Sequence, residues 1–136
     1  MTLYTYRHKV LFQHCDPAGI VFYPRYLEMV NTTVETWFEQ DLSMSFSYIH
    51  NKMNIAVPTV SLNIKFSAPS YLGDILDFHF LPMKISKKSF QFQIEAFCDK
   101  EQRFSMYSTI VCTTYKSIQS LAWPQSLYTK IIQTIK

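Results

Sequence analysis

Residues 13 to 26 read Gln-His-Cys-Asp-Pro-Ala-Gly-Ile-Val-Phe-Tyr-Pro-Arg-Tyr. Asp16 precedes Pro17, which favours an extended conformation at Asp16 and predicts the end of a strand. Pro24 suits the first position of a helix, because its missing N–H would have no partner there. Gly19 is one of only two glycines in the chain, so we expect a tight backbone path at this point. The stretch predicts a carboxylate close to the free N–H groups and positive end of a helix.

Such an arrangement suits acyl transfer. A carboxylate can attack a carbonyl carbon or deprotonate a water molecule. The N–H groups of a helix start can hold the negative charge that develops on the carbonyl oxygen. Asp16 and the helix start are therefore the first candidates for a catalytic site.

The elements around this stretch follow from the spacing of apolar residues. Tyr4 to His14 is rich in β-branched and aromatic residues and predicts a strand. From Pro24 to Gln40, apolar residues recur at three- and four-residue steps, which predicts a helix of about four turns. Asp41 to Asn54 is polar and indicates a loop with a short helical turn.

The second half of the chain is dominated by a period of two. From Ile55 the alternation predicts a strand that runs to Phe66 and has one buried face. Three further strands are predicted at Ile75–Ile85, Phe90–Cys98 and Phe104–Tyr115, and a terminal helix at Trp123–Lys136 with Ile131, Ile132 and Ile135 on one side. The short connections between the last strands favour a meander of four antiparallel strands. One long helix must then cover a face of a five-stranded sheet, so we expect an α+β fold. A sheet this small has open edges, and pairing with a second copy would cover one of them.

Composition limits the classes of function. A chain of 136 residues is one domain, 1–136, with a net charge of +3 and no basic stripe of the kind that binds nucleic acid. It has neither an apolar run long enough for membrane insertion nor a signal peptide, so a cytoplasmic location is expected. Three cysteines without a CxxC pair indicate reduced thiols, and Cys15 is interpreted as a packing residue. His50 and His79 lack the spaced partners of a metal site, and no cofactor is expected.

Several segments together resemble one known family. They are Cys15-Asp16-Pro17-Ala18-Gly19-Ile20-Val21, Tyr23-Pro24, Phe66-Ser67-Ala68-Pro69-Ser70-Tyr71-Leu72-Gly73-Asp74 and Ser86-Lys87-Lys88-Ser89-Phe90. In this order they resemble the hotdog-fold thioesterases of the 4-hydroxybenzoyl-CoA thioesterase type. The resemblance implies a long central helix wrapped by a curved five-stranded antiparallel sheet. It also implies homodimers, often paired into homotetramers, and an acyl-CoA substrate bound in a tunnel at the subunit interface.

The resemblance assigns roles to residues. It implies that Asp16 is the catalytic carboxylate, that the backbone N–H of Tyr23 contacts the thioester carbonyl, and that Lys87 and Lys88 contact the phosphates of coenzyme A. We place Gly19, Asn31 and Ser89 with the two lysines as expected substrate-binding residues. A thiol of pKa about 8.5 leaves without an acid, so one carboxylate and an oxyanion site can suffice. Asp16 then acts as nucleophile or as general base.

Two positions depart from the family pattern. Asn31 stands where the family member acting on 4-hydroxybenzoyl-CoA has an acid, which puts that substrate in doubt. His14 replaces an acid before the Cys-Asp pair. A protonated His14 would hold Asp16 ionised, whereas the plainer interpretation makes it a surface histidine.

Other interpretations stay open. Asp16 can brace a turn through its side chain, and Lys87 and Lys88 can be a solvated hairpin tip. A thioesterase acting on acyl-carrier-protein thioesters and a noncatalytic acyl-CoA binding module both fit the pattern. A hotdog dehydratase is disfavoured, because it needs a histidine on the central helix and residues 24–40 contain none.

Overall fold

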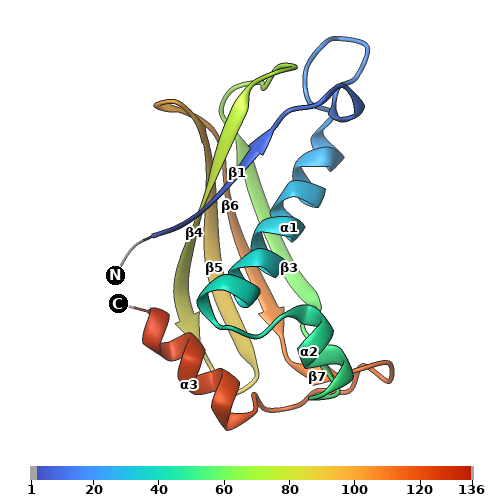
Figure 1. Cartoon of the computed structure of the whole chain (residues 1–136), viewed down its shortest axis with the longest axis vertical. Coiled ribbons are helices and arrows are strands. Elements are labelled where there is room, and N and C mark those ends of the chain that lie inside the picture. The colour runs from blue at the N-terminus through green and yellow to red at the C-terminus, as the bar shows by residue number, and fades with distance from the viewer. Residues whose placement is uncertain (1–2, 136) are drawn as a thin grey trace.

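The computed structural model describes residues 3–135 and places one long helix along the face of an antiparallel sheet (Figure 1). The main sheet contains β1 (Tyr4–Lys9), β3 (Thr59–Phe66), β4 (Ile75–Ile85), β5 (Ser89–Cys98) and β6 (Glu101–Val111). A small second sheet pairs β2 (Ile55–Ala56) with β7 (Thr113–Thr114). The helices are α1 (Tyr23–Asp41), α2 (Phe46–Asn51) and α3 (Gln125–Thr134), with a 3-10 turn at Phe12–His14. The predicted α+β fold with a central helix, five strands and a C-terminal helix is confirmed.

The order of strands in the main sheet is β1-β4-β5-β6-β3. The meander is correct for β4, β5 and β6. It is wrong for β3, which pairs with β6 at the far edge, because residues 67–74 cross the end of the sheet and β4 pairs with β1 instead. Consequently β1 and β3 are the two edge strands.

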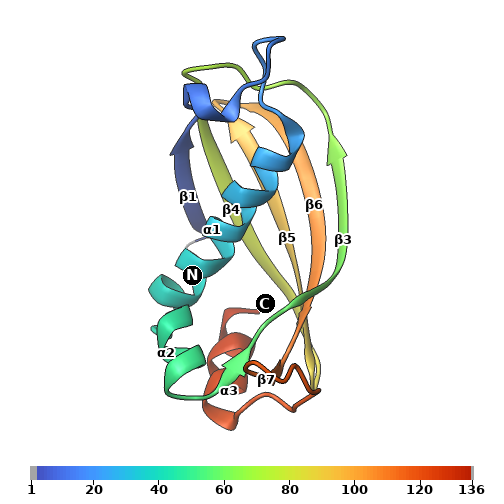
Figure 2. The same ribbon diagram turned by 90° about the vertical axis from the view of Figure 1, so that its right-hand side faces the viewer.

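Helix α1 lies along the concave face of the sheet, and α3 covers one end of the same side (Figure 2). The apolar stripe of α1 is buried against aromatic residues of the sheet. The indole of Trp37 stacks on Phe80 and Phe90 with ring centroids 4.3 and 5.5 Å apart. The fully buried residues of this core include Phe38, Phe78, Phe92, Phe104 and Ile94. The helix therefore forms because its apolar face has a complementary sheet to pack on.

Four predicted segments differ from the structure. The strand expected from Ile55 to Phe66 is divided into β2 and β3, which belong to different sheets. The first strand was expected to reach His14 but ends at Lys9, because Val10 pairs with residues 73–74 and the chain then makes the 3-10 turn. The strand expected over Phe104–Tyr115 begins three residues earlier, and its last residues form β7. On α3, Ile131 is buried but Ile132 is 44% exposed, because neighbouring residues of a helix point about 100° apart. Lys136, the last residue of the predicted terminal helix, lies outside the described residues.

The predicted buried face of β3 is also wrong for the single chain. Val60 is 60% exposed and Leu62 is 44% exposed. The strand lies at the edge of the sheet (Figure 2), where Tyr26 of α1 reaches Phe66 with ring centroids 5.6 Å apart but leaves Val60 and Leu62 exposed. β3 therefore presents an uncovered apolar strip beside a free row of backbone groups.

The three cysteines are free, and none of them forms a disulfide. Burial raises the pKa of the Cys112 thiol to about 11. Within residues 3–135, no helix is both long enough and apolar enough to cross a membrane.

Candidate functional site

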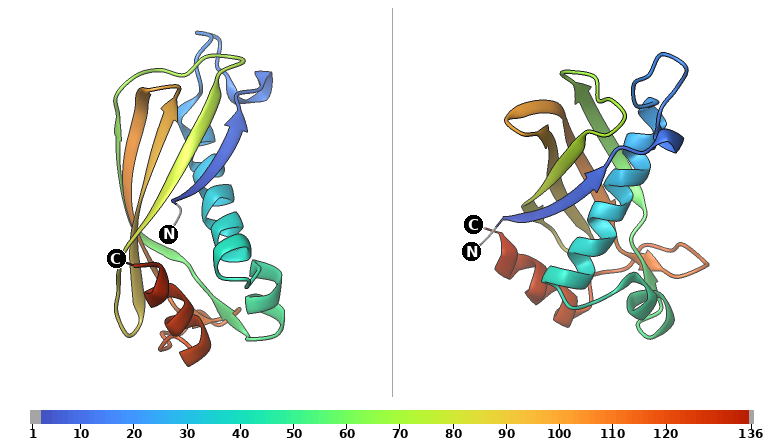
Figure 3. Two further views of the ribbon diagram at one scale, coloured as in Figure 1. Left: turned by 60° about the vertical axis from the view of Figure 1, so that its left-hand side comes forward. Right: turned by 45° about the horizontal axis from the view of Figure 1, so that its top comes forward.

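The loop that carries Asp16 stands beyond the end of the sheet, directly before α1 (Figure 3). The Asp16 N–H donates to the Ile20 carbonyl and the Gly19 N–H donates to the Asp16 carbonyl, both at 2.9 Å. Cys15 and Val21 pair across the base of the loop. Gly19 has a φ of +84°, where an L-residue is strained. The predicted tight turn at Gly19 is therefore confirmed.

The carboxylate of Asp16 is partly buried and is fixed on one side only. Its Oδ1 accepts a hydrogen bond from the Ala18 N–H at 2.9 Å, so the side chain does brace a turn. Its Oδ2 receives no hydrogen bond from residues 3–135. The turn orients the carboxylate and leaves one oxygen available to a ligand.

The start of α1 offers a backbone donor. Pro24 was expected at the first position of the helix, but the helix begins one residue earlier, at Tyr23. Phe22 is therefore the residue that caps it, and it makes no side-chain cap. The Phe22 N–H donates to the His14 carbonyl at 2.9 Å, and the Arg25 N–H donates to the Phe22 carbonyl at 2.8 Å. Tyr23 is the first helical residue, and its N–H has no acceptor within residues 3–135. An unpaired N–H therefore lies at the positive end of the helix dipole.

His14 ties the loop together through a nitrogen of its ring. Its side chain is buried at 7% exposure, so the prediction of a surface histidine is wrong. Its Nδ1 accepts the Leu11 N–H at 2.9 Å, which requires that nitrogen to be unprotonated. Within residues 3–135, no hydrogen bond or ion pair joins the His14 ring to the Asp16 carboxylate. The role of His14 is to fix residues 11–14 beneath the helix start.

Asn31 lies two turns along α1 and lines a half-open cavity of about 240 Å³ between α1, α2 and the β3 side of the sheet. The other lining residues are Leu27, Val30, Val34, Phe46, Val57, Thr59, Leu62, Phe92, Ser108 and Ile110. None of these side chains is charged. Leu27 is four residues after Tyr23, so the cavity begins about 6 Å below the helix start, at 1.5 Å per residue.

Lys87, Lys88 and Ser89 lie at the hairpin between β4 and β5, at the other end of the sheet from Asp16. Both lysines are exposed, while their carbonyls accept the N–H groups of Trp123 and Cys112 at 3.0 Å. The 11 residues of β4 separate this hairpin from the Asp16 loop by about 33 Å, at 3.3 Å per step between residues. A single chain therefore does not bring the two lysines to Asp16.

Sequence reasoning missed three contributors. Phe46 of α2 and Leu62 of β3 line the cavity beside Asn31. Ser70 accepts the Val21 N–H on its carbonyl at 2.9 Å and so anchors the end of the Asp16 loop. The segment around Ser70 did stand out in the sequence, but its contact with the loop depends on tertiary structure.

Comparison with known proteins identifies the family. Residues 10–131 match the model of the thioesterase-like superfamily. A 1,4-dihydroxy-2-naphthoyl-CoA hydrolase from Synechocystis sp. is 32% identical over 76 residues, which cover 56% of this chain and 54% of that protein. The matched segments span between 54% and 67% of the length of the curated relatives.

Solved structures share the fold. The crystal structure of a 1,4-dihydroxy-2-naphthoyl-CoA thioesterase from Synechocystis has a TM-score of 0.86 at 24% identity, with 96% of each chain covered. A thioesterase superfamily structure from Jannaschia sp. CCS1 has a TM-score of 0.92 at 22% identity, with 99% of this chain and 94% of that chain covered. The fold expected from the sequence, the hotdog fold, is confirmed, and the match over residues 10–131 shows that this chain belongs to the thioesterase-like superfamily.

Proposed function

We propose that the protein is an acyl-CoA thioesterase, which hydrolyses a thioester to a free carboxylic acid and coenzyme A. One observation carries the proposal. Asp16 keeps a free carboxylate oxygen in a loop that leads straight to the unpaired Tyr23 N–H at the start of α1. Family membership supports the same reaction class.

The proposed reaction divides the work between these groups. The Tyr23 N–H donates to the thioester carbonyl oxygen and stabilises the negative charge that develops there. Asp16 either attacks the carbonyl carbon to form a mixed anhydride, which water then cleaves, or removes a proton from the attacking water. In both routes the C–S bond breaks and coenzyme A leaves as a thiolate, which needs little help from an acid because a thiol has a pKa of about 8.5.

For the acyl group we propose a hydroxylated bicyclic aromatic acid, with 1,4-dihydroxy-2-naphthoyl-CoA as the first candidate. The curated relative is named for that substrate. The cavity of about 240 Å³ exceeds the roughly 150 Å³ that holds one benzene ring. Its Phe46 and Phe92 can pack on rings, and the Asn31 amide can hydrogen-bond to a ring hydroxyl. A neutral amide at this position fits a neutral hydroxyaryl group.

We further propose that two copies assemble the site through β3, as a homodimer or within a homotetramer. The uncovered apolar strip and free edge of β3 support this pairing. A two-fold axis makes paired edges antiparallel, so the Asp16 end of one chain meets the hairpin end of its partner. The partner's Lys87 and Lys88 then lie where they can bind the phosphates of coenzyme A, with the partner's Ser89 beside them.

A hydrolysis panel tests the proposal. The purified protein is assayed with aromatic, short-chain and long-chain acyl-CoA esters, with the matching acyl-carrier-protein thioesters, and with pantetheine-truncated esters. We expect aromatic acyl-CoA esters to have the highest kcat/KM. Faster cleavage of the carrier-protein esters would show that the protein is an acyl-carrier-protein thioesterase. If no thioester is cleaved, the enzymatic proposal is refuted in favour of a noncatalytic binding module.

A further inference from the structure

Arg103 is a charged residue that a β-bulge turns toward the interior of the protein. Between β5 and β6, Ala96 pairs with Phe104 and Phe97 pairs with Gln102, so Arg103 has no partner across the strands. Because of this extra residue, Arg103 and Phe104 are consecutive and both buried, which a regular strand does not allow. The side chain of Arg103 is 9% exposed.

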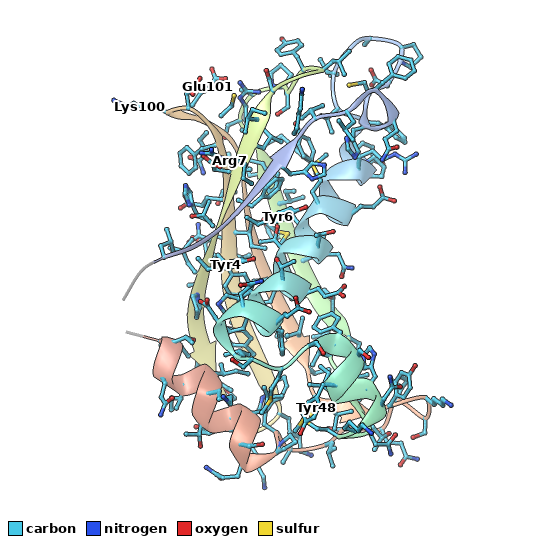
Figure 4. The ribbon with its side chains drawn as sticks, in the orientation of Figure 1. Tyr4, Tyr6, Arg7, Tyr48, Lys100 and Glu101 are labelled. Atoms are coloured by element: carbon cyan, nitrogen blue, oxygen red, sulfur yellow. The ribbon has the colours of Figure 1, made fainter. Side chains whose placement is uncertain are left out.

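The guanidinium of Arg103 joins the two ends of one loop segment, Pro69–Asp74. Its Nη1 donates to the Pro69 carbonyl at 3.0 Å and to Asp74 Oδ2 at 2.7 Å. The same Asp74 oxygen accepts the Tyr71 N–H at 2.9 Å. The Glu101 carboxylate, from the first residue of β6 (Figure 4), lies 2.8 Å from Arg103 Nε and adds a second anion at the rim.

The positive charge of Arg103 affects the pKa of the Asp74 carboxyl group. Burial pushes the pKa of Asp74 upward, but hydrogen bonds from Arg103 and Tyr71, with the Arg103 charge, outweigh burial, and the pKa lies below its ordinary value. The carboxylate therefore stays ionised, and the Arg103–Asp74 contact is a charge-assisted hydrogen bond.

The Pro69–Asp74 segment, which Arg103 holds, supports the Asp16 loop at both ends of the loop. At the start, the Gly73 N–H donates to the Val10 carbonyl at 2.9 Å and the Val10 N–H donates to the Asp74 carbonyl at 2.8 Å. At the end, the Val21 N–H donates to the Ser70 carbonyl at 2.9 Å. Both ends of residues 10–21 are therefore hydrogen-bonded to the segment that Arg103 stabilises.

We propose that Arg103 is the positioning residue of the Asp16 loop: through the Pro69–Asp74 segment it sets where the carboxylate lies relative to the Tyr23 N–H. The inference rests on the proposed catalytic role of Asp16, and Arg103 itself touches no substrate. It acts on geometry, and a displacement of about 1 Å in a reacting group can lower the rate about 100-fold.

Hydrogen–deuterium exchange tests the support without using activity. We expect Arg103→Gln to speed exchange of the Gly19 and Val21 amides on the order of tenfold and to leave the amides of β5 unchanged. Asp74→Asn, which keeps the shape of the side chain and removes its charge, should act in the same direction and carries the test if Arg103→Gln does not fold. The matched control is Arg7→Gln on β1 (Figure 4), which breaks an exposed ion pair with Asp77 of β4. Unchanged exchange in residues 16–22 would overturn the proposal.

Kinetics separate positioning from general stability. We expect Arg103→Gln to lower kcat about 10- to 100-fold with KM changed less than about threefold, and to have no further effect on kcat in an Asp16→Asn background. An equal loss in both backgrounds would mean that Arg103 acts on the fold alone and would overturn the proposal. If the wild type cleaves no thioester, the proposed function fails, and the exchange experiment still decides whether Arg103 holds the loop.

Discussion

Asp16 uses its two carboxylate oxygens differently. Oδ1 is held by the Ala18 N–H, which fixes the orientation of the side chain, and Oδ2 is free of hydrogen bonds from residues 3–135. A nucleophile or base needs such a fixed position together with an available lone pair. The bracing interpretation and the catalytic interpretation of Asp16 are therefore compatible, because each uses a different oxygen.

His8 gives the protein a predicted pH dependence. Its ring lies 5.0 Å from that of His14, and its Nδ1 lies 3.2 Å from the Tyr6 hydroxyl. Burial, and then repulsion from the His14 ring once that ring is protonated, lower the pKa of His8 below its ordinary value of 6.5. Below pH 6.5 the unfolded chain therefore binds more protons at this residue than the folded protein does, and stability falls as the pH falls.

We expect wild type to lose stability relative to His8→Gln as the pH drops from 8 to 5, with a slope of at most about 1.4 kcal/mol per pH unit. Urea unfolding at a series of pH values measures the difference. Parallel stability curves for the two proteins would contradict the prediction.

At the level of elements, the helices and strands with a clear apolar period were predictable. The end of β1 and the position of β3 in the sheet were not. Helix α1 and the β4–β5 hairpin follow from apolar periods of 3.6 and 2. The end of β1 depends on the distant residues Gly73 and Asp74, and the place of β3 beside β6 depends on the path of residues 67–74. The sequence therefore located Asp16 and the helix start, while the cavity and the support from Ser70 required the three-dimensional structure.

The β4–β5 hairpin carries the predicted contacts with coenzyme A. We expect the double variant Lys87→Ala with Lys88→Ala to raise KM for acyl-CoA esters, because it removes two positive charges from the phosphates. The KM for a pantetheine-truncated ester, which lacks those phosphates, should not change. Steady-state kinetics with both substrates measure this, and an equal rise for both would remove the phosphate role.

Strand β3 carries the predicted contact between copies. We expect Leu62→Lys to weaken self-association, because it places a charge in the apolar strip of an edge strand. Sedimentation velocity measures the oligomeric state. Ile132→Lys is the matched control, since Ile132 is equally exposed but lies on α3. A Leu62→Lys protein that associates as wild type does would place the interface elsewhere.

At the scale of the whole molecule, the fold separates two parts of one proposed site. Asp16 and the Tyr23 N–H lie at one end of the sheet, and Lys87 and Lys88 lie at the other. Antiparallel pairing of two β3 edges brings Asp16 and the Tyr23 N–H of one chain close to the partner's Lys87 and the partner's Lys88 in every site. The cavity between α1 and β3 is lined by Thr59 and Leu62 of the edge strand at which the second copy is proposed to bind. Assembly and activity are therefore predicted to depend on each other.

Asp16 is proposed to drive thioester hydrolysis, and the kcat of the Asp16→Asn variant tests this role. The asparagine Oδ1 can still accept the Ala18 N–H, so we expect an unchanged melting temperature. With the best acyl-CoA ester, kcat should fall about 10²- to 10⁴-fold. Asp99→Asn, at an exposed hairpin position with positive φ that asparagine also adopts, should keep wild-type activity. If the Asp16→Asn protein is as fast as wild type, Asp16 does not drive the hydrolysis.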